Sequence, residues 1–176
     1  MLAIAFTGGP GFGKSTTLAA LDARGYKCVQ ESARAIIQER VSNGLSKRPP
    51  APEFAEQILA RDQAQYRRVQ NTQGPVFFDR SVIDALGMCE ELGLSRTVGL
   101  PRMLKEYRFH RSAFVFPPWR EIYAMDAERD QTLQEAITVD EAVRKWYRRY
   151  GFDLIEVPCV SVEARCDFIL AQLPAS

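Results

Sequence analysis

The sequence contains a single histidine, His110, and four cysteines that never form a CxxC pair. Structural zinc sites take their ligands from closely spaced cysteines and histidines, and this sequence offers no such spacing. We expect the cysteines to be free thiols, because disulfide frameworks belong to oxidising compartments. Neither a zinc site nor a disulfide scaffold is therefore expected to be the basis of the fold.

Long hydrophobic runs and an excess of one charge are also missing. No stretch approaches the roughly 20 apolar residues of a membrane-spanning helix. The first apolar run, Leu2–Phe6, is short and follows no basic segment, so we expect no secretory signal and a cytoplasmic protein. The 23 basic and 22 acidic residues give a net charge of +1, which predicts no general attraction to nucleic acid or anionic membranes.

What the sequence does contain is an alternation of short apolar runs and amphipathic segments. Expected strands are Leu2–Phe6, Tyr26–Gln30, residues 76–78, Ser112–Phe116 and Phe152–Val157. Expected helices cover about residues 14–24, 32–44, 52–71, 82–91, a stretch after Pro101, 138–150 and 161–173. Strands that alternate with helices predict a parallel sheet covered on both faces, a three-layer α/β fold. Its 176 residues suit one domain, residues 1–176.

A glycine-rich loop follows the first expected strand and satisfies the pattern G-x-x-x-x-G-K-[ST]. Glycines let several backbone N–H groups turn toward one point and let phosphate oxygens approach closely. The helix that begins at Lys14 adds the positive end of its dipole, and the lysine reaches the β- and γ-phosphates. We therefore predict a site for ATP or GTP with Mg²⁺. Its residues are Gly8, Gly9, Pro10, Gly11, Phe12, Gly13, Lys14, Ser15 and Thr16.

The third expected strand ends in Asp79 followed by Arg80. Ser15 and Asp79 are the predicted Mg²⁺ ligands, Asp79 through water. A motor ATPase usually carries a second carboxylate after this aspartate to orient the attacking water, and here a cation stands in that position. The exchange favours phosphoryl transfer to a bound acceptor, which Arg80 would orient, over hydrolysis. The alternative is a structural Asp–Arg pair at a strand end.

Glu31 closes the second expected strand. The carboxyl ends of parallel strands gather at one edge of a sheet, where ligands bind. Glu31 could therefore face the γ-phosphate and take the proton of an attacking hydroxyl as a general base. Equally, its carboxylate could accept N–H bonds at the start of the following helix, where Ser32 can also act as a cap.

A lid is expected over about residues 117–131, after Pro117 and Pro118 end the fourth strand. Arg120 and Arg129 lie in this segment and could close over the triphosphate, neutralise transition-state charge and exclude water. The alternative is a solvated segment with internal ion pairs.

Two weaker signals concern basic residues. Arg34 and Arg61 lie on helices that should border the acceptor pocket, although either could be an ordinary surface arginine. The stretch RKWYRRY, residues 144–150, is basic and aromatic; helical spacing favours Val143, Trp146 and Tyr150 packing inward with the charges solvated.

Several segments together resemble a known family: GGPGFGKSTTL, the strand that ends at Glu31, FFDRSVIDALG, VFPPWREIYAMDAERDQT and FDLIEVPCVSVEARCDFIL. They resemble the small AAA-type ATP-binding family related to the nicotinamide-riboside-kinase domain of the bacterial NAD regulator, and more widely the nucleoside and nucleotide kinases. The resemblance implies a sheet of strand order 2-3-1-4-5, a lid that carries Arg120 and Arg129, and a loop at Pro158–Val162 beside the nucleotide base.

The sequence thus predicts a Mg²⁺-dependent kinase that binds a nucleoside triphosphate and a small acceptor such as a nucleoside or nucleotide. Its catalytic residues would be Lys14, Glu31, Asp79, Arg80, Arg120 and Arg129. A different reading is an ATP- or GTP-dependent switch that signals through order in the lid. A ring-forming ATPase is a third reading, and the missing acidic pair after the third strand weighs against it.

Overall fold

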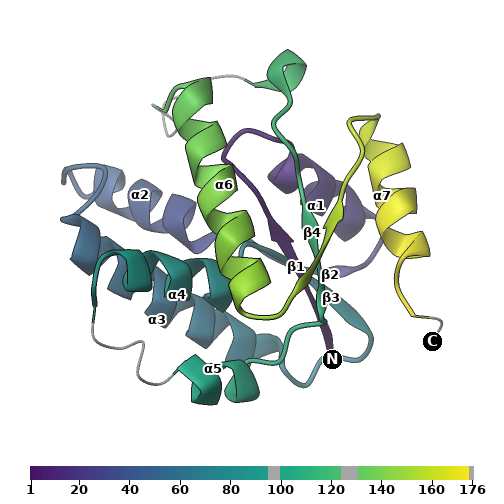
Figure 1. Ribbon diagram of the computed structural model, residues 1–176, viewed down its shortest axis with the longest axis horizontal. Coiled ribbons are helices and arrows are strands. Elements are labelled where there is room, and N and C mark those ends of the chain that lie inside the picture. The colour runs from purple at the N-terminus through teal and green to yellow at the C-terminus, as the bar shows by residue number, and fades with distance from the viewer. Residues whose placement is uncertain (95–99, 124–130, 175–176) are drawn as a thin grey trace.

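The computed structural model describes residues 1–94, 100–123 and 131–174. Five strands form one parallel sheet in the order β2-β3-β1-β4-β5 (Figure 1). They are β1 (Leu2–Thr7), β2 (Lys27–Val29), β3 (Pro75–Asp79), β4 (Ser112–Val115) and β5 (Asp153–Glu156). This order confirms the one that the family resemblance implies.

The helices lie on both faces of this sheet. They are α1 (Lys14–Ala23), α2 (Ser32–Ser42), α3 (Ala51–Val69), α4 (Val82–Glu91), α5 (Leu100–Glu106), α6 (Leu133–Arg149) and α7 (Val162–Ala171), with a 3₁₀ turn, η2 (Arg120–Ile122). Helices α1 and α7 pack together on one side, whereas α2, α3, α4 and α6 form a connected layer on the other (Figure 1). The three-layer α/β architecture is confirmed.

The central strands are apolar on both faces, as a sheet covered by helices requires. In β3, Phe77 packs into the core beneath α1 and α7, while Val76 and Phe78 join the core formed with α2, α3 and α4. The pairing of Phe6 with Asp79 and of Thr7 with Val115 brings the ends of β1, β3 and β4 to one level. The segments that follow these strands therefore meet at one edge of the sheet.

Helix α6 begins at Leu133, five residues before the predicted start at Thr138. A capping box explains the difference: the Thr132 hydroxyl accepts from the backbone N–H of Glu135, and the Glu135 carboxylate accepts from the N–H of Thr132. The prediction that Ser32 caps α2 is also wrong. Glu31 holds the cap position without a side-chain bond, and Ser32 is the first helical residue.

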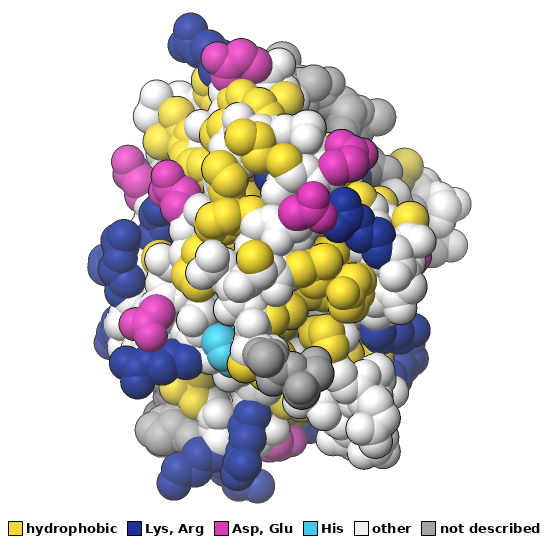
Figure 2. All heavy atoms as spheres, turned by 90° about the vertical axis from the view of Figure 1, so that its right-hand side faces the viewer, with side chains coloured by type: hydrophobic (Ala, Val, Ile, Leu, Met, Phe, Trp, Pro, Cys, Tyr) yellow, Lys and Arg dark blue, Asp and Glu magenta, His cyan; other side chains and the backbone are white. Residues whose placement is uncertain are grey.

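The surface carries charges of both signs. On the face shown in Figure 2, acidic and basic side chains are both present, with hydrophobic side chains between them. Among the described helices, none is long and apolar enough to cross a membrane.

Candidate functional site

The glycine-rich loop connects β1 to α1, at the sheet edge where the strands end. Gly13 has a φ of 89°, a left-handed conformation that glycine adopts without strain. Lys14 is buried, and its ammonium donates to the carbonyl oxygens of Gly8 at 3.2 Å and Gly9 at 2.6 Å. Burial, followed by the charge of Arg80, lowers the pKa of Lys14 to about 8. The loop carbonyls therefore hold the Lys14 ammonium in a site that is largely shielded from solvent.

Only some residues of the glycine-rich loop line a cavity; the others are packed against the protein. Pro10, Gly11 and Gly13 line a cavity, together with residues 14–16 at the start of α1. Gly9 does not line it, and a Cβ there would lie 2.3 Å from the carbonyl oxygen of Ala136. The Phe12 side chain is buried in the core. Gly9 and Phe12, both predicted to bind nucleotide, thus have packing roles as well.

Ser15 and Asp79 meet at the foot of the loop. The Ser15 hydroxyl donates to Oδ2 of Asp79 at 2.6 Å, and the other carboxylate oxygen, Oδ1, is buried without a hydrogen-bond partner. Burial, then the nearby charge of Glu31, raises the pKa of Asp79. A hydroxyl beside a carboxylate with an unused oxygen is the donor set that Mg²⁺ prefers, so these residues fit the ion.

Arg80 joins three parts of the site. Its Nε donates to Glu31 at 2.9 Å, Nη1 to Asp84 at 3.1 Å and Nη2 to the carbonyl oxygen of Gly8 at 3.0 Å. It is also the only described residue other than glycine with a positive φ, 67°, and its backbone N–H donates to Phe6. A strained backbone held by so many bonds marks a position whose side-chain direction matters.

Glu31 is therefore ion-paired with Arg80, and its carboxylate makes no bond to the N-terminus of α2. Burial alone would raise the pKa of Glu31, but the charges of Arg80 and Lys14 outweigh it and hold the pKa below its usual value. Glu31 is consequently a carboxylate that lines the cavity beside the phosphate loop.

Asp84, which sequence reasoning did not select, is the centre of a buried network behind Arg80. Its Oδ1 accepts from the Thr7 hydroxyl at 2.7 Å, and its Oδ2 accepts from the Tyr147 hydroxyl at 2.7 Å and the Ser81 N–H at 3.0 Å. The Ser81–Asp84 part is a capping box for α4, a pattern readable in the sequence. The contacts to β1 and α6 depend on tertiary structure.

The predicted lid is placed only in part. Arg129 lies outside the described residues, and Arg120 lies in η2, exposed and away from the cavity lining. Ile122 and Gln131, at the two ends of the segment that is not described, both line the cavity. Two described residues of the predicted lid thus line the cavity, but Arg120, the lid arginine that the structure describes, does not.

A different arginine, Arg165 of α7, lies against the phosphate loop. It is 4% exposed, donates from Nη1 to the Gly13 carbonyl at 3.3 Å, and packs over the Trp119 ring at 5.3 Å. Its Nε is buried without a partner, and the side chain lines the cavity. Helical spacing gives a signal for this position in the sequence, because Arg165 stands one turn before the buried Ile169, on the inward face of α7.

The cavity, of about 820 Å³, extends from the phosphate loop to a second pocket between α2, α3, α4 and α6. Of the two arginines for which both possibilities were open, Arg34 lines the cavity, whereas Arg61 does not and is ion-paired with Glu39 at 2.7 Å. Val162, from the loop predicted beside the nucleotide base, also lines the cavity.

The second pocket has an apolar wall with one unusual polar group. Its apolar residues include Ile37, Phe54, Ile58, Met88, Val143 and Trp146. Asp62 of α3 also lines the pocket; it is 9% exposed and accepts a hydrogen bond from the Ser32 hydroxyl at 2.5 Å. Burial raises the pKa of Asp62 to about 7. Sequence reasoning did not select Asp62.

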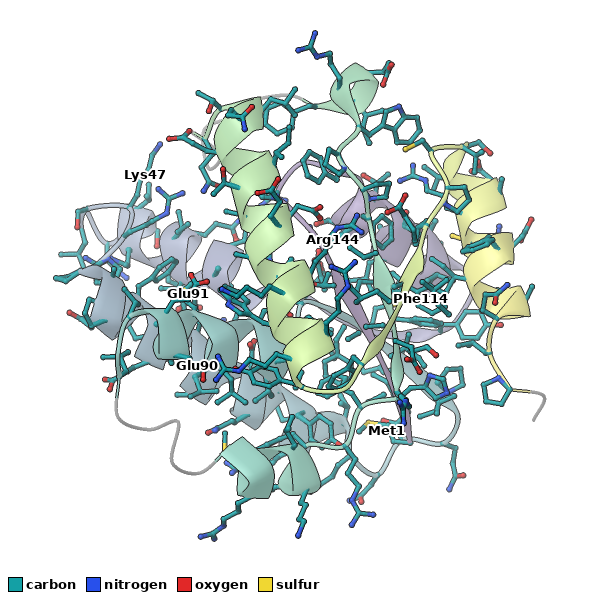
Figure 3. The ribbon with its side chains drawn as sticks, viewed as in Figure 1. Met1, Lys47, Glu90, Glu91, Phe114 and Arg144 are labelled. Carbon is teal, nitrogen blue, oxygen red and sulfur yellow. The ribbon has the colours of Figure 1, made fainter. Side chains whose placement is uncertain are left out.

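Helix α6 joins this pocket to the phosphate loop. Trp146 packs inward as predicted and donates to Glu91 of α4 at 3.0 Å, while Tyr147 rather than Tyr150 is fully buried. Arg144 extends from α6 toward the sheet, pairs with Asp140 at 2.6 Å, and that aspartate accepts from the Gly9 N–H (Figure 3). The prediction of inward aromatic packing is confirmed for Trp146.

Comparison with known proteins gives the following likenesses. A family model described as an AAA domain matches residues 3–165. No curated protein matches the sequence significantly. Deoxyadenosine kinase from M. mycoides with bound dATP has a TM-score of 0.62 at 14% identity, covering 97% of this chain and 98% of that chain. Thymidylate kinase from Candida albicans has a TM-score of 0.63 at 12% identity, covering 97% and 89%.

A third similar structure is the NadR protein in complex with NAD and AMP-PNP. Its TM-score is 0.69 at 12% identity, and the match covers 99% of this chain but 51% of that chain. At such identities the likeness shows a shared fold, that of P-loop kinases.

Proposed function

Since the chain belongs to the AAA-domain family of P-loop proteins, we propose that it is a Mg²⁺-dependent phosphotransferase that uses ATP to phosphorylate a small acceptor. The acceptor would be a nucleoside, a nucleotide or a similar metabolite. The observation that carries the proposal is the shape of the cavity, which runs from the phosphate loop into a second pocket between α2, α3, α4 and α6. A second substrate held there would have its reacting group beside Glu31 and Arg80.

In this proposal the phosphate loop binds the triphosphate through its backbone N–H groups and the Lys14 ammonium. Ser15 and Asp79 would hold Mg²⁺, which when bound neutralises charge on the β- and γ-phosphate oxygens. Arg165 would contact the phosphates from α7, because its guanidinium already lies against Gly13. Lid residues Arg120 and Arg129 stay predictions that require closure of the lid over the nucleotide.

Glu31 would accept the proton of the attacking hydroxyl. Its carboxylate is ionised at neutral pH, because the neighbouring cations hold the pKa down, and it lies next to the cavity. Arg80 would keep that carboxylate in place while its other bonds fix the guanidinium between the loop and α4. Proton transfer to a correctly positioned side chain contributes typically about 10²- to 10⁴-fold to rate.

The direct test is ADP formation with candidate acceptors: nucleosides, nucleoside monophosphates, nicotinamide riboside and related vitamins. The right acceptor should raise the rate of ADP release well above the rate with Mg-ATP alone. Glu31→Gln should lower the turnover rate at least 100-fold with unchanged ATP affinity, whereas Glu39→Gln, an exposed change on the helix that follows Glu31, should have no effect. A Glu31→Gln rate within a few-fold of wild type eliminates the base.

The competing function is a nucleotide-dependent switch. A protein that binds Mg-ATP tightly but releases ADP at the same slow rate with every acceptor would fit that function and not the kinase.

A further inference from the structure

The second pocket contains a buried oxygen that nothing in the described protein satisfies. Asp62 Oδ2 has no hydrogen-bond partner among the described residues, although the side chain is more than nine-tenths buried. Leaving a buried acceptor unpaired costs about 1–3 kcal/mol. Such a group calls for an explanation, and a bound ligand that donates to it is one.

The bonds around Asp62 fix which of its oxygens is available. The Gln65 side-chain amide donates to Ser32 Oγ at 3.3 Å, and the Ser32 hydroxyl in turn donates to Asp62 Oδ1 at 2.5 Å. Ser32 has one proton and gives it to Oδ1, whereas Oδ2 receives no hydrogen bond from the described residues. The chain of bonds therefore holds the carboxyl group in one orientation and leaves Oδ2 for a ligand, whose N–H group would pair with the ionised form of Asp62.

Asp62 lines the same cavity as Glu31, the residue proposed to accept the proton of the attacking hydroxyl. Ser32, its partner, directly follows Glu31, whose carboxylate turns to Arg80 at the phosphate end. Glu31, Ser32 and Asp62 all line one cavity. A molecule lying along this wall would present one group to Glu31 and another to Asp62. The walls around Asp62, including Phe54, Ile58 and Trp146, are apolar and suit a flat ring.

We propose that Asp62 selects the acceptor by accepting, at Oδ2, a hydrogen bond from an N–H group on a ring at the end remote from the phosphorylated hydroxyl. The substrate class is then an uncharged heterocyclic alcohol with a ring amide or amino group, as in a nucleoside. The inference rests on the proposed function for the identity of the pocket, but its test measures binding.

A hydrogen bond of this kind can discriminate strongly between ligands with and without the N–H group. A site built to pair with a ligand N–H rejects an analogue without it, because its own buried polar group is then left unpaired. Arg34 and Arg48 also line the cavity, so an acceptor that carries a phosphate is the competing possibility.

The experiment uses the whole chain with Mg²⁺ and AMP-PNP, and titrates matched nucleosides by calorimetry. The pairs are adenosine and purine riboside, cytidine and 2-pyrimidinone riboside, and thymidine and 3-methylthymidine, where the second member lacks the N–H group. We expect one pair at least to differ by 10-fold or more in Kd. Adenosine and thymidine monophosphates form a separate arm, and tighter binding of these than of any nucleoside would overturn the uncharged class.

The test variant is Asp62→Asn, which keeps the volume and can still accept from Ser32, but places an N–H₂ group where Oδ2 was. The preference for the N–H-bearing nucleoside should fall to within twofold or reverse. AMP-PNP affinity, measured on the same variant, shows whether the fold is intact. Glu53→Gln, the same chemical change at an exposed site of α3, should keep the full preference.

The outcomes separate the two proposals. Equal affinities within every pair, a preference that survives in Asp62→Asn, or no nucleoside binding at all would each overturn the role of Asp62. Selective binding without ADP formation would support that role and remove the kinase. ADP formation with a selectivity that Asp62→Asn leaves unchanged would support the kinase and remove the role of Asp62.

Discussion

The two ends of the cavity are built in different ways. At the phosphate end, Glu31 after β2 and Arg80 after β3 form an ion pair, and Asp84 of α4 accepts hydrogen bonds from Arg80 and from Thr7 at the end of β1. At the other end, four helices contribute a largely apolar wall, in which Asp62 carries a buried carboxyl oxygen without a hydrogen-bond partner. The first end is organised before any ligand arrives; the second is completed by its ligand. The residues proposed to act on the phosphates and the residue proposed to select the acceptor thus lie at different ends of the cavity.

The largest effect should come from Lys14→Ala at the phosphate end. The variant loses a buried cation that lies at the loop, and charge-assisted bonds to phosphate are worth about 1.5–3 kcal/mol each. We expect the affinity for Mg-AMP-PNP to fall roughly 100-fold or more by calorimetry. Lys27→Ala, an exposed lysine on β2, is the control and should bind normally. Unchanged heat for Lys14→Ala would refute the nucleotide site.

The second-largest effect should be the loss of protein stability caused by Asp84→Ala, at the same end of the cavity. Asp84→Ala removes the acceptor for Thr7, Arg80 and Tyr147, and leaves a buried guanidinium with one carboxylate fewer. Breaking a buried ion pair in this way costs about 3–5 kcal/mol. The free energy of unfolding, measured with urea, should fall by that amount.

Tyr147→Phe is the matched variant for this network, because it removes one hydroxyl and keeps the ring. It should cost about 1 kcal/mol. If Asp84→Ala were no more damaging than Tyr147→Phe, the phosphate end would not be organised by Asp84, and the contrast between the two ends would weaken.

The ends also differ in how far the sequence predicts them. Lys14, Ser15 and Asp79 come from contiguous patterns at strand ends, so their meeting follows from a parallel sheet alone. Asp62 and Arg165 lie on helices, and their approach to the cavity depends on how α3 and α7 pack. No local pattern encodes that packing.

Glu31 illustrates the same limit at the phosphate end. Its place at the end of β2 was predicted, but its ion pair with Arg80 depends on the positive φ of that arginine, which propensity does not predict for a non-glycine residue. The early start of α6 is different. Thr132 and Glu135 have the spacing of a capping box, and the sequence alone could have shown it.

A smaller effect tests the shape of the second pocket. Gly87 of α4 faces Trp146, and a Cβ there would lie 2.1 Å from the indole ring. Gly87→Ala must therefore displace the ring, at a cost of about 1–3 kcal/mol in unfolding free energy. It should also disturb acceptor binding, because Trp146 lines the pocket, and leave Mg-AMP-PNP affinity unchanged.

The double variant Gly87→Ala/Trp146→Leu separates steric overlap from other causes. Without the indole, the added methyl has room, and the alanine itself favours the helix by about 1 kcal/mol over glycine. Gly87→Ala should therefore be neutral or stabilising in the Trp146→Leu background. A full loss of stability in both backgrounds would contradict the contact.

The smallest expected effect is the pH dependence that Asp62 gives to folding. Burial, opposed by the Ser32 bond, raises the folded-state pKa of Asp62 to about 7, with Asp84 and Glu31 raising it further and Arg80 lowering it. A carboxyl group with a raised pKa holds its proton more tightly when folded, so its contribution to stability is full at low pH and is lost as the pH rises toward 7. Between pH 6 and pH 7 the loss should be about 1 kcal/mol.

Asp62→Asn has no proton to release, and the difference in unfolding free energy between wild type and this variant should change by that amount. Because Asp79 titrates in both proteins, the difference isolates Asp62; a difference that stays constant with pH would show that its carboxyl group is solvated rather than confined in an apolar pocket.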